Sequence, residues 1–349
     1  MLIRVEVNQM ELSERKKLVL SNIVEQYIAT GSPVGSKAVC SSLDSACSSA
    51  TVRNEMSELI ELGYLIQPHT SAGRIPSNKG FRFYVKSLMK KYKLSDQDKK
   101  FIDDSLPQYI DNPDDFMVKA GRVLANITRC AAVTTIPIDR DATLAKAEVI
   151  PMGEGTVLMA VLTSSGMIKN RVCHCDVSVT SEDAELFVHV INKTFSGKKL
   201  CNITPAQVQN LAPVFGSRML ALSSVLNSFF LTVQDFIDIK YRFEGETNLL
   251  FRGDMSEKSL LNILGFLSKK ESLSQILKRV GENTEVLIGE ETDEEALSSA
   301  AIISSGYSGK SHMIGKIAII GPTRLDYSHY IPSIEYFASA IEKILLKNI

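Results

Sequence analysis

Apolar residues near the start of the chain recur three and four positions apart, which predicts an amphipathic helix from about Ser13 to Thr30. Ser13 suits the N-cap position, and Gly31 followed by Pro33 ends the helix. At 100° per residue, one stripe about 140° wide holds Leu20, Ile23, Val24, Tyr27 and Ile28. We expect this stripe to face a core.

Two shorter helices are predicted next, over about 36–43 and 49–62, and they are joined by a polar turn. Gly63 follows the second of them at the position where a left-handed glycine ends many helices. Its inward side carries Val52, Met56, Leu59 and Ile60. Its outer side carries small and hydrogen-bonding residues, namely Ala50, Arg53, Asn54, Ser57 and Glu61. Taken alone, this helix is more typical of a solvated surface than of a binding site. The neighbouring elements determine which interpretation is favoured.

The following residues predict a small hairpin and a fourth helix. Residues 64–67 and 74–75 are the expected strands, and 68–73 the polar turn between them. Ser77 is the expected N-cap of a helix over 78–93, whose buried stripe holds Phe81, Tyr84, Val85, Leu88, Met89 and Tyr92. The far side gathers, within about 80°, the cations Lys79, Arg82, Lys86, Lys90 and Lys93. This order of elements is typical of a winged helix-turn-helix, which places one helix in the DNA major groove and a loop beside it.

The rest of the chain has an α+β pattern. Residues 95–115 are polar and acidic, contain Pro107 and Pro113, and are expected to be a linker. Helices are predicted over 114–129, 180–195 and 334–346, and strands over 131–138, 145–150, 156–163, 167–175, 285–289, 300–305 and 314–320. The stretch 205–280 is mostly helical by its pattern and rich in Leu, Phe and Ile.

Bulk composition indicates a soluble cytoplasmic protein. The chain has 349 residues, enough for two or three domains, with 44% hydrophobic and 23% charged residues. No uninterrupted apolar run reaches the roughly 18 residues that suggest a membrane span, and the first residues lack the pattern of a secretory signal. The 6 cysteines are too sparse and irregular for a disulfide framework, so we expect reduced thiols.

Charge is distributed unevenly along the chain. Residues 1–95 hold 13 Lys+Arg against 8 Asp+Glu, a net charge of +5. The remainder holds 26 against 32, a net charge of −6, within totals of 39 and 40. No acid lies between Glu61 and Asp96, where seven cations do. A basic N-terminal module on an acidic body predicts a polyanionic partner at one end only.

No residue pattern predicts catalysis, a cofactor or a metal. On a strand, Cys173-His174-Cys175 can turn only two of its three ligands to one face, and no second pair lies nearby. Gly153-Glu154-Gly155 lacks the Lys-Ser/Thr of a phosphate-binding loop and is more typical of a hairpin turn. No Ser-His-Asp set can be assembled from spacing. We therefore expect no enzyme, no cofactor and no metal site.

Several motifs closely resemble the bacterial heat-inducible transcription repressor family, HrcA. They are SSATVRNEM (48–56), LGYL (62–65), PHTSAGRIP (68–76), GFRFYV (80–85) and GKIAIIGPTRLDY (315–327). The unbroken PHTSAGRIP is the most specific of them. The chain departs from the family pattern at Ser49, where proline is usual, and at 251–255, where a Pro-Glu-Phe run is expected.

The resemblance implies a domain organisation. Residues 1–94 would be the winged helix-turn-helix, 95–115 a linker, and 116–196 with 282–349 a GAF-like α+β domain. An inserted dimerisation domain, mostly helical, would occupy 197–281. The resemblance further implies a homodimer that binds an inverted-repeat operator of the CIRCE type before chaperone operons. A GroEL-type chaperonin would help it to reach its active fold. On heat stress less chaperonin would be available, and the repressor would leave the operator.

The candidate DNA-binding residues follow from the motif and the helical faces. Arg53, Asn54 and Ser57 would read bases. Ser49 and Thr51 lie at the start of the same helix, and Thr51, Arg74, Lys79, Arg82 and Lys86 would hold phosphates. His69, Thr70 and Ser71 would form the tip of the wing.

A second hypothesis stays open. The body could belong to a small-molecule sensor or enzyme with a DNA-binding appendage, with an effector bound in the GAF-like domain. Fold analogy alone is weak support for such a pocket. A ligand that copurifies with the protein would favour this hypothesis, and operator binding without effector would favour the first.

Overall fold

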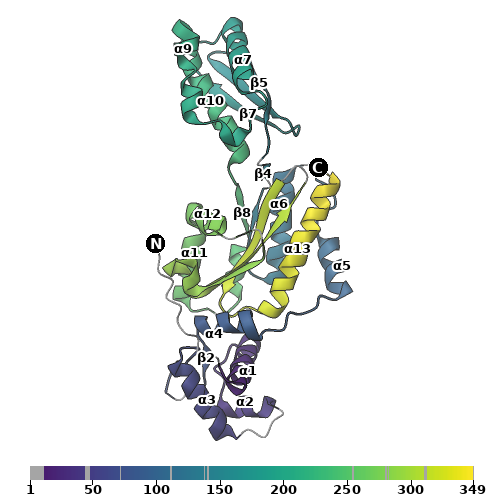
Figure 1. Cartoon of the computed structure of the whole chain (residues 1–349), viewed down its shortest axis with the longest axis vertical. Helices are drawn as coiled ribbons and strands as arrows, with labels where there is room; N and C mark the ends of the chain where they lie inside the picture. Colours follow the sequence, from purple (N-terminus) through teal and green to yellow (C-terminus); the bar gives the residue numbers. More distant parts are fainter. Residues whose placement is uncertain are drawn as a thin grey trace.

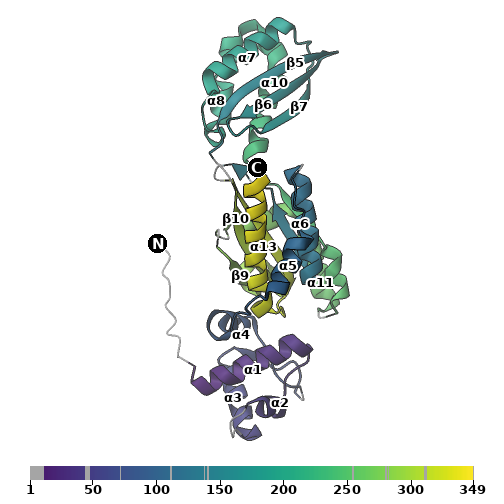
Figure 2. The same ribbon diagram turned by 90° about the vertical axis from the view of Figure 1, so that its right-hand side faces the viewer.

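The computed structural model describes residues 12–43, 48–70, 72–110, 112–136, 138–139, 141–253, 255–279, 281, 283–309 and 313–348. The chain has a mixed helix and sheet fold in three parts that follow one another along its long axis (Figure 1). An N-terminal unit lies at one end, a six-stranded sheet with its helices lies in the middle, and a three-stranded sheet with its helices lies at the other end (Figures 1 and 2).

The N-terminal unit contains the predicted helices and hairpin. Its elements are α1 (Glu14–Thr30), α2 (Ser36–Ser42), α3 (Ser49–Glu61), β1 (Leu65–Ile66), β2 (Ile75–Pro76), α4 (Asn78–Phe83) and the π-helical turn η1 (Tyr84–Leu88). The Ser13 hydroxyl accepts from the Lys16 amide at 3.3 Å and caps α1, and Gly31 ends it with φ +69°. The apolar stripe of α1 packs inward as predicted, with Leu20, Ile23 and Val24 fully buried.

The fourth helix is shorter than the sequence predicts. It widens into the π-helical turn after Phe83, and Met89 is already extended at ψ 132°. Contacts beyond the turn explain the early end. The Tyr92 amide donates to the Ser328 carbonyl at 3.0 Å, and the Tyr92 ring lies 4.9 Å from the His329 ring. These tertiary contacts draw 89–92 along the middle unit, so the expected five-cation helical face does not form.

Gly80 lets α4 lie directly on the hairpin. A Cβ at this position would come within 2.2 Å of the Tyr64 carbonyl oxygen. The Ser77 hydroxyl caps α4 by accepting from the Gly80 amide at 3.0 Å and donates to the Gly63 carbonyl at 2.6 Å. The close approach therefore joins the end of α3, the hairpin and α4 into one packed unit.

The middle unit is built on an antiparallel sheet of order β8-β3-β11-β10-β9, with β4 paired to β11. Its strands are β3 (Ala131–Thr135), β4 (Ile138–Asp139), β8 (Tyr241–Glu244), β9 (Glu285–Ile288), β10 (Ala300–Ser308) and β11 (Met313–Pro322). Helices α6 (Pro113–Thr128) and α13 (Tyr327–Asn348) cover one face, and α11 (Glu257–Leu267) and α12 (Lys270–Arg279) lie on the other. Short helical turns η4 (Glu246–Phe251), η5 (Gly289–Thr292) and η6 (Glu295–Leu297) connect these elements.

Both faces of this sheet are buried, which explains the nearly continuous apolar runs of β10 and β11. Ile317 and Ile319 point to the core shared with α13, whereas Ala318 and Ile320 point to the core shared with α11 and α12. Alternate residues of a strand face opposite sides of a sheet. The result is a three-layer unit of helices, sheet and helices.

The third unit has a sheet covered on one face. Strands β5 (Leu144–Gly153), β6 (Thr156–Thr163) and β7 (Ile168–His174) pair in that order and with no other described strand. Helices α7 (Ser181–Phe195), α8 (Pro205–Gln209), α9 (Ala212–Phe215) and α10 (Met219–Ile237), with the turns η2 (Leu200–Asn202) and η3 (Gly216–Arg218), complete the unit. The predicted turn at 153–155 joins β5 and β6, with positive φ at all three residues.

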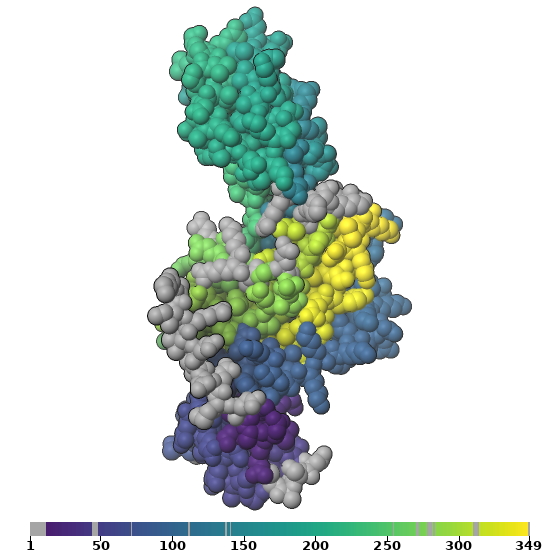
Figure 3. Space-filling model, in the orientation of Figure 1, coloured from purple at the N-terminus to yellow at the C-terminus, as the bar shows by residue number. Residues whose placement is uncertain are grey.

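The expected boundary at 196/197 does not match this sheet pairing. The family resemblance places strands β5 to β7 in the same domain as β9 to β11. In the structure they form a separate sheet that shares a core with α7 and α10. The expected end of the insertion at 281 also differs, because α11, α12 and β8 pack in the middle unit. Periodicity identifies a strand but not its partner, so the sequence could not place these pairings. The chain enters the third unit after β4 and leaves it before β8, through a narrow connection (Figure 3).

The segment expected to be a linker contains a docked helix. Helix α5 (Asp96–Ser105) begins with a capping box between Ser95 and Asp98. Its Ile102 is buried, and the Tyr336 hydroxyl of α13 donates to the Asp103 carboxylate at 2.8 Å. This part of the expected linker is therefore a regular helix that packs against the middle unit.

One segment among the described residues, Pro205–Ile237, is long and apolar enough to cross a membrane by length and composition. In the structure it is three consecutive helices rather than one. Leu222, Val225 and Phe229 of α10 are fully buried against the three-stranded sheet and α7. Its apolar residues thus supply the core of the third unit.

Replacing Gly80 by alanine should destabilise the protein, because the added methyl group meets the Tyr64 carbonyl. We expect Gly80→Ala to lower the free energy of unfolding by about 1–3 kcal/mol. Gly265→Ala is the matched control, since no atom lies within 4 Å of its Cβ and the residue lies in helix α11. That control should be neutral or stabilise by up to about 1 kcal/mol. Equal denaturation midpoints for Gly80→Ala and the natural chain would contradict the tight packing of α4.

Candidate nucleic-acid interface

Helix α3 lies with α2 at the end of the N-terminal unit that is farthest from the middle sheet (Figures 1 and 2). The Ser48 hydroxyl caps it by accepting from the Thr51 amide at 3.1 Å and lies 2.9 Å from the Thr51 hydroxyl. The Ser49 hydroxyl lies 3.0 Å from that of Ser36 at the start of α2. Ser49 and Thr51 are half-buried, and these bonds fix where α3 begins relative to α2.

The outer side of α3 carries the predicted base-reading residues. Arg53, Asn54 and Ser57 are exposed, while Val52 and Met56 on the opposite side are buried. The Ser57 hydroxyl donates to the Arg53 carbonyl at 3.1 Å, one turn back along the helix. The side chains that could reach a partner are thus held on one rigid, capped helix.

Lys16 of α1 neutralises two carboxylates of α3. Its Nζ lies 3.2 Å from Glu55 Oε2 and 2.8 Å from Glu58 Oε2. The hydrogen bonds that Lys16 donates to Glu58 and then to Glu55 raise the pKa of Lys16. The acids of α3 are therefore partly compensated from within the unit, which favours approach of a polyanion to the exposed side that carries Arg53.

The hairpin and its loop lie beside α3. Strands β1 and β2 pair Leu65 with Pro76 and Ile66 with Ile75, and a bridge between Val34 and Arg74 adds a third segment. In the loop, Gln67 Nε2 donates to the Thr70 carbonyl at 2.8 Å. His69 and Thr70 are exposed, whereas Ser71 lies outside the described residues. Arg74 is half-buried, and its Nη1 donates to the Ala72 carbonyl at 3.0 Å, so it braces the loop.

The predicted phosphate-binding cations of α4 have different environments. Lys79 is exposed, with its Nζ 2.8 Å from the Leu62 carbonyl at the end of α3 and 4.5 Å from the centre of the Tyr64 ring. Lys86 is exposed. Arg82 is half-buried, and its guanidinium forms an ion pair with Glu291 and donates to the Val286 carbonyl. Its charge is compensated by the middle unit.

Sequence reasoning missed the contacts through which the middle unit holds the N-terminal unit. Asn78 Nδ2 donates to Glu290 Oε2 at 2.7 Å and to the Ser298 carbonyl at 3.0 Å. Arg324 Nη1 donates to the Ile28 carbonyl near the end of α1 at 2.7 Å. The signal was present in GPTRLDY at 321–327, but the motif does not say which surface it meets.

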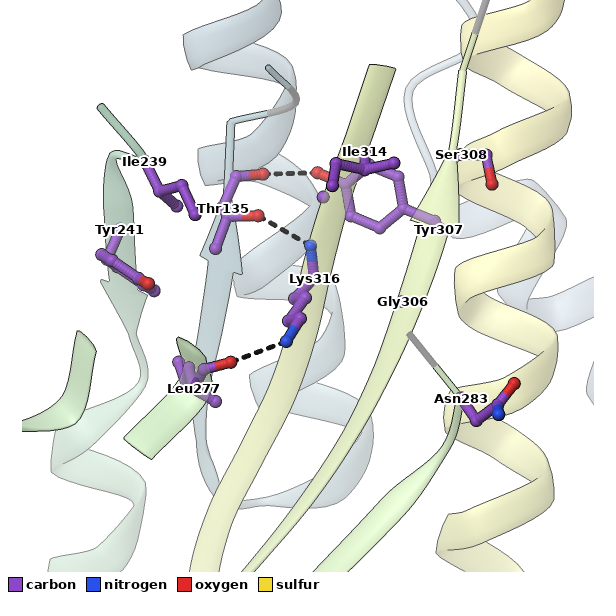
Figure 4. Close-up of a pocket in the computed structure, with 11 residues that line it drawn as sticks. Thr135, Ile239, Tyr241, Leu277, Asn283, Gly306, Tyr307, Ser308, Ile314 and Lys316 are labelled. Carbon is purple, nitrogen blue, oxygen red and sulfur yellow. Dashed lines mark hydrogen bonds between the residues drawn. The ribbon is translucent and has the colours of Figure 1, made fainter. Parts of the chain in front are cut away.

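A cavity of about 300 Å³ lies in the middle unit between β8, β3 and β11 (Figure 4). Three hydrogen bonds between lining residues are drawn as dashed lines in Figure 4. The Tyr307 hydroxyl donates to the Thr135 carbonyl, and the Lys316 amide donates to Thr135 Oγ1 at 2.7 Å. Lys316 Nζ donates to the Leu277 carbonyl at 2.7 Å. Burial raises the pKa of Tyr307, so its hydroxyl stays protonated and keeps this bond.

Comparison with known proteins identifies the family. The family model described as the HrcA protein C terminal domain matches residues 114–331. The heat-inducible transcription repressor HrcA of Acetivibrio thermocellus is 32% identical over 338 residues, which cover 96% of each chain. That of Halalkalibacterium halodurans is 31% identical over 336 residues, covering 96% of this chain and 98% of its own. These relatives are named as transcription repressors, not as enzymes.

A solved structure has a similar fold along the whole chain. It is a crystal structure described as that of a hypothetical protein, with a TM-score of 0.62 and 24% identity. It covers 97% of this chain and 99% of its own. The family match over more than half of the chain, together with relatives matched along nearly its full length, shows that this chain belongs to the HrcA family of heat-inducible transcription repressors.

Proposed function

We propose that the chain represses transcription of chaperone operons in the cytoplasm by binding as a homodimer to an inverted-repeat operator. The observation that carries the proposal is the exposed outer side of α3, where Arg53, Asn54 and Ser57 stand on a capped helix beside a hairpin loop. Residues on one exposed helical side can reach base edges in the major groove. Membership of a repressor family supports the same function.

In this proposal the N-terminal unit, about 12–92, is a winged helix-turn-helix. Helix α3 is the recognition helix and the β1–β2 hairpin is the wing, with His69, Thr70 and Ser71 at its tip. Ser49 and Thr51 lie near the backbone at the start of α3, and Arg74, Lys79 and Lys86 supply phosphate contacts. Arg82 is left out because Glu291 already pairs with it.

The middle unit, about 113–139 and 239–348, is proposed as the GAF-like domain. The third unit, about 141–238, is proposed as the inserted dimerisation domain. An inverted repeat requires two DNA-binding units related by a two-fold axis, so one surface of the chain must meet itself.

The open face of the three-stranded sheet suits this contact. Strand register aligns Ile150, Leu158 and Val172 in one row across β5, β6 and β7, and Leu162 faces Ile168 in another. Ile150, Ile168 and Val172 are 51%, 66% and 55% exposed. Helices α7 and α10 cover only the opposite face. Apolar side chains exposed as a contiguous set mark interaction surfaces, and we propose a second copy of this chain as the partner.

A GroEL-type chaperonin is the proposed link to heat. The third unit interrupts the middle unit in sequence, so strands β4 and β8 on either side of the insertion must find the same sheet. Long-range pairing forms late and exposes apolar surface during folding. When heat supplies the chaperonin with other unfolded clients, less repressor reaches its active form and the operator opens.

The first prediction concerns base reading. Arg53→Ala should weaken operator binding by roughly 1–3 kcal/mol and relax base preference at one position in each half-site. Lys86→Ala should weaken binding to all DNA sequences alike, and the slope of log K against log salt should become shallower by about one unit. Fluorescence anisotropy with operator and scrambled duplexes separates the two patterns. If Arg53→Ala left affinity and preference unchanged, α3 would not be the reading helix.

The second prediction concerns the dimer. Val172→Arg puts a charge on the apolar face, in the same row as Ile150 and Leu158. It should turn dimers into monomers at micromolar concentration, measured by light scattering. Leu220→Arg is the matched control, because Leu220 is 76% exposed but lies on α10, away from this face. Dissociation by Leu220→Arg and not by Val172→Arg would move the interface to the helices.

The third prediction concerns folding. At a fixed temperature, unfolded protein should recover more operator binding with chaperonin and ATP than without them. The difference should grow with protein concentration, because exposed apolar surface leads to aggregation. Equal recovery in both arms at every concentration would remove the chaperonin from the mechanism.

A further inference from the structure

The N-terminal unit and the middle unit share one continuous hydrophobic core. Phe81 of α4 and Tyr327 of α13 are both fully buried, with ring centres 6.0 Å apart. Tyr27 of α1 packs on the other side of Phe81 at 6.3 Å. The Tyr327 hydroxyl donates to the Thr323 carbonyl at 2.6 Å, so its buried polar atom is satisfied. The two units are therefore packed together and not merely tethered.

Polar contacts surround this aromatic core on the α4 side. Arg82 makes two contacts to the Glu291 carboxylate, and the Val286 carbonyl accepts a further bond. Glu291 is itself held, because its Oε2 accepts from the Ile288 amide at 2.8 Å. A planar guanidinium that meets a carboxylate with two bonds fixes direction as well as distance. This pair constrains the rotation of α4 on the middle unit.

Two further contacts act at other points of the same joint. Asn78 reaches Glu290 and the Ser298 carbonyl beside Gly289, where a Cβ would come within 2.0 Å of Asn78 Nδ2. Arg324 holds the last turn of α1 through the Ile28 carbonyl. Restraints at α4 and at α1 together oppose both tilt and twist of the N-terminal unit.

We propose that Arg82 and Glu291 are positioning residues that set the angle of the recognition helix and so determine which spacing between operator half-sites is accepted. The inference rests on the proposed binding of a dimer to an inverted repeat. Each added base pair turns one half-site by about 35° and moves it by about 3.4 Å relative to the other. A stiff joint resists that rotation, whereas a loosened joint follows it.

The experiment measures binding of the full-length dimer to duplexes that carry the CIRCE inverted repeat with its natural spacer, with one base pair added, or with one removed. A duplex with a single half-site is the fourth probe. The variants are Arg82→Gln and Glu291→Gln. Gln at 291 keeps an acceptor for the Ile288 amide. Arg122→Gln breaks an ion pair with Glu244 within the middle unit and is the matched control.

We expect Glu291→Gln and Arg82→Gln to weaken binding to the natural spacer by about tenfold and to leave the half-site duplex within twofold of the natural chain. Discrimination between spacers should shrink in both variants. The slope of log K against log salt should not change, because no phosphate contact is lost. Light scattering and thermal unfolding check that each variant is a folded dimer.

Three outcomes would overturn the inference. Glu291→Gln could leave spacer discrimination unchanged, or Arg122→Gln could reduce it equally. Arg82→Gln could instead weaken half-site and full operator alike with a flatter salt slope, which would return Arg82 to phosphate binding. Failure of the natural chain itself to prefer the inverted repeat over scrambled DNA would reject the proposed function. Failure of the positioning role leaves that preference intact.

Discussion

The packing of Phe81 against Tyr327 is the constraint on which the rest of the structure depends. It joins a residue of the basic N-terminal unit to the first turn of the last helix, and both side chains are fully buried. Burying two aromatic side chains contributes several kcal/mol in order of magnitude. The hydrogen bonds of Asn78, Arg82 and Arg324 stand around this contact and give it direction. The orientation of α3 is consequently a property of the whole chain.

Local elements could be predicted from the sequence because their causes are local. The capped ends of α1 and α7, the span of β6 and the turn at 153–155 follow from apolar periodicity, N-cap residues and glycine. Which strands share a sheet could not be predicted, because an apolar strand has the same pattern whatever its partner. The early end of α4 could not be predicted either, because it depends on contacts of Tyr92 with Ser328 and His329, which lie far away in the sequence.

In the candidate site, too, local features could be predicted from the sequence and contacts between distant residues could not. Arg53, Asn54 and Ser57 were predicted to be exposed because their neighbours at Val52 and Met56 define the opposite, buried side of one helix. Arg82 was assigned to DNA because a cation on a helical surface has the same sequence pattern whether it faces solvent or a carboxylate. In the structure Arg82 pairs with Glu291, which belongs to a different unit. Sequence patterns thus identify which residues a helix presents but not what the fold already occupies.

The arrangement of units constrains how the repressor can be controlled. The proposed dimer face and the exposed side of α3 lie at opposite ends of the molecule, with the middle unit between them (Figures 1 and 2). In the proposed dimer, the relative orientation of the two chains determines the orientation of each α3 only through the three-layer middle unit and the contact between Phe81 and Tyr327. In the proposed dimer, unfolding of either connection would leave two DNA-binding units that are tethered but not oriented. Loss of orientation would then weaken binding to an inverted repeat, because each half-site alone binds weakly. In the proposed scheme, control acts through the folded fraction of the repressor, and folding alone can change that fraction without a bound ligand.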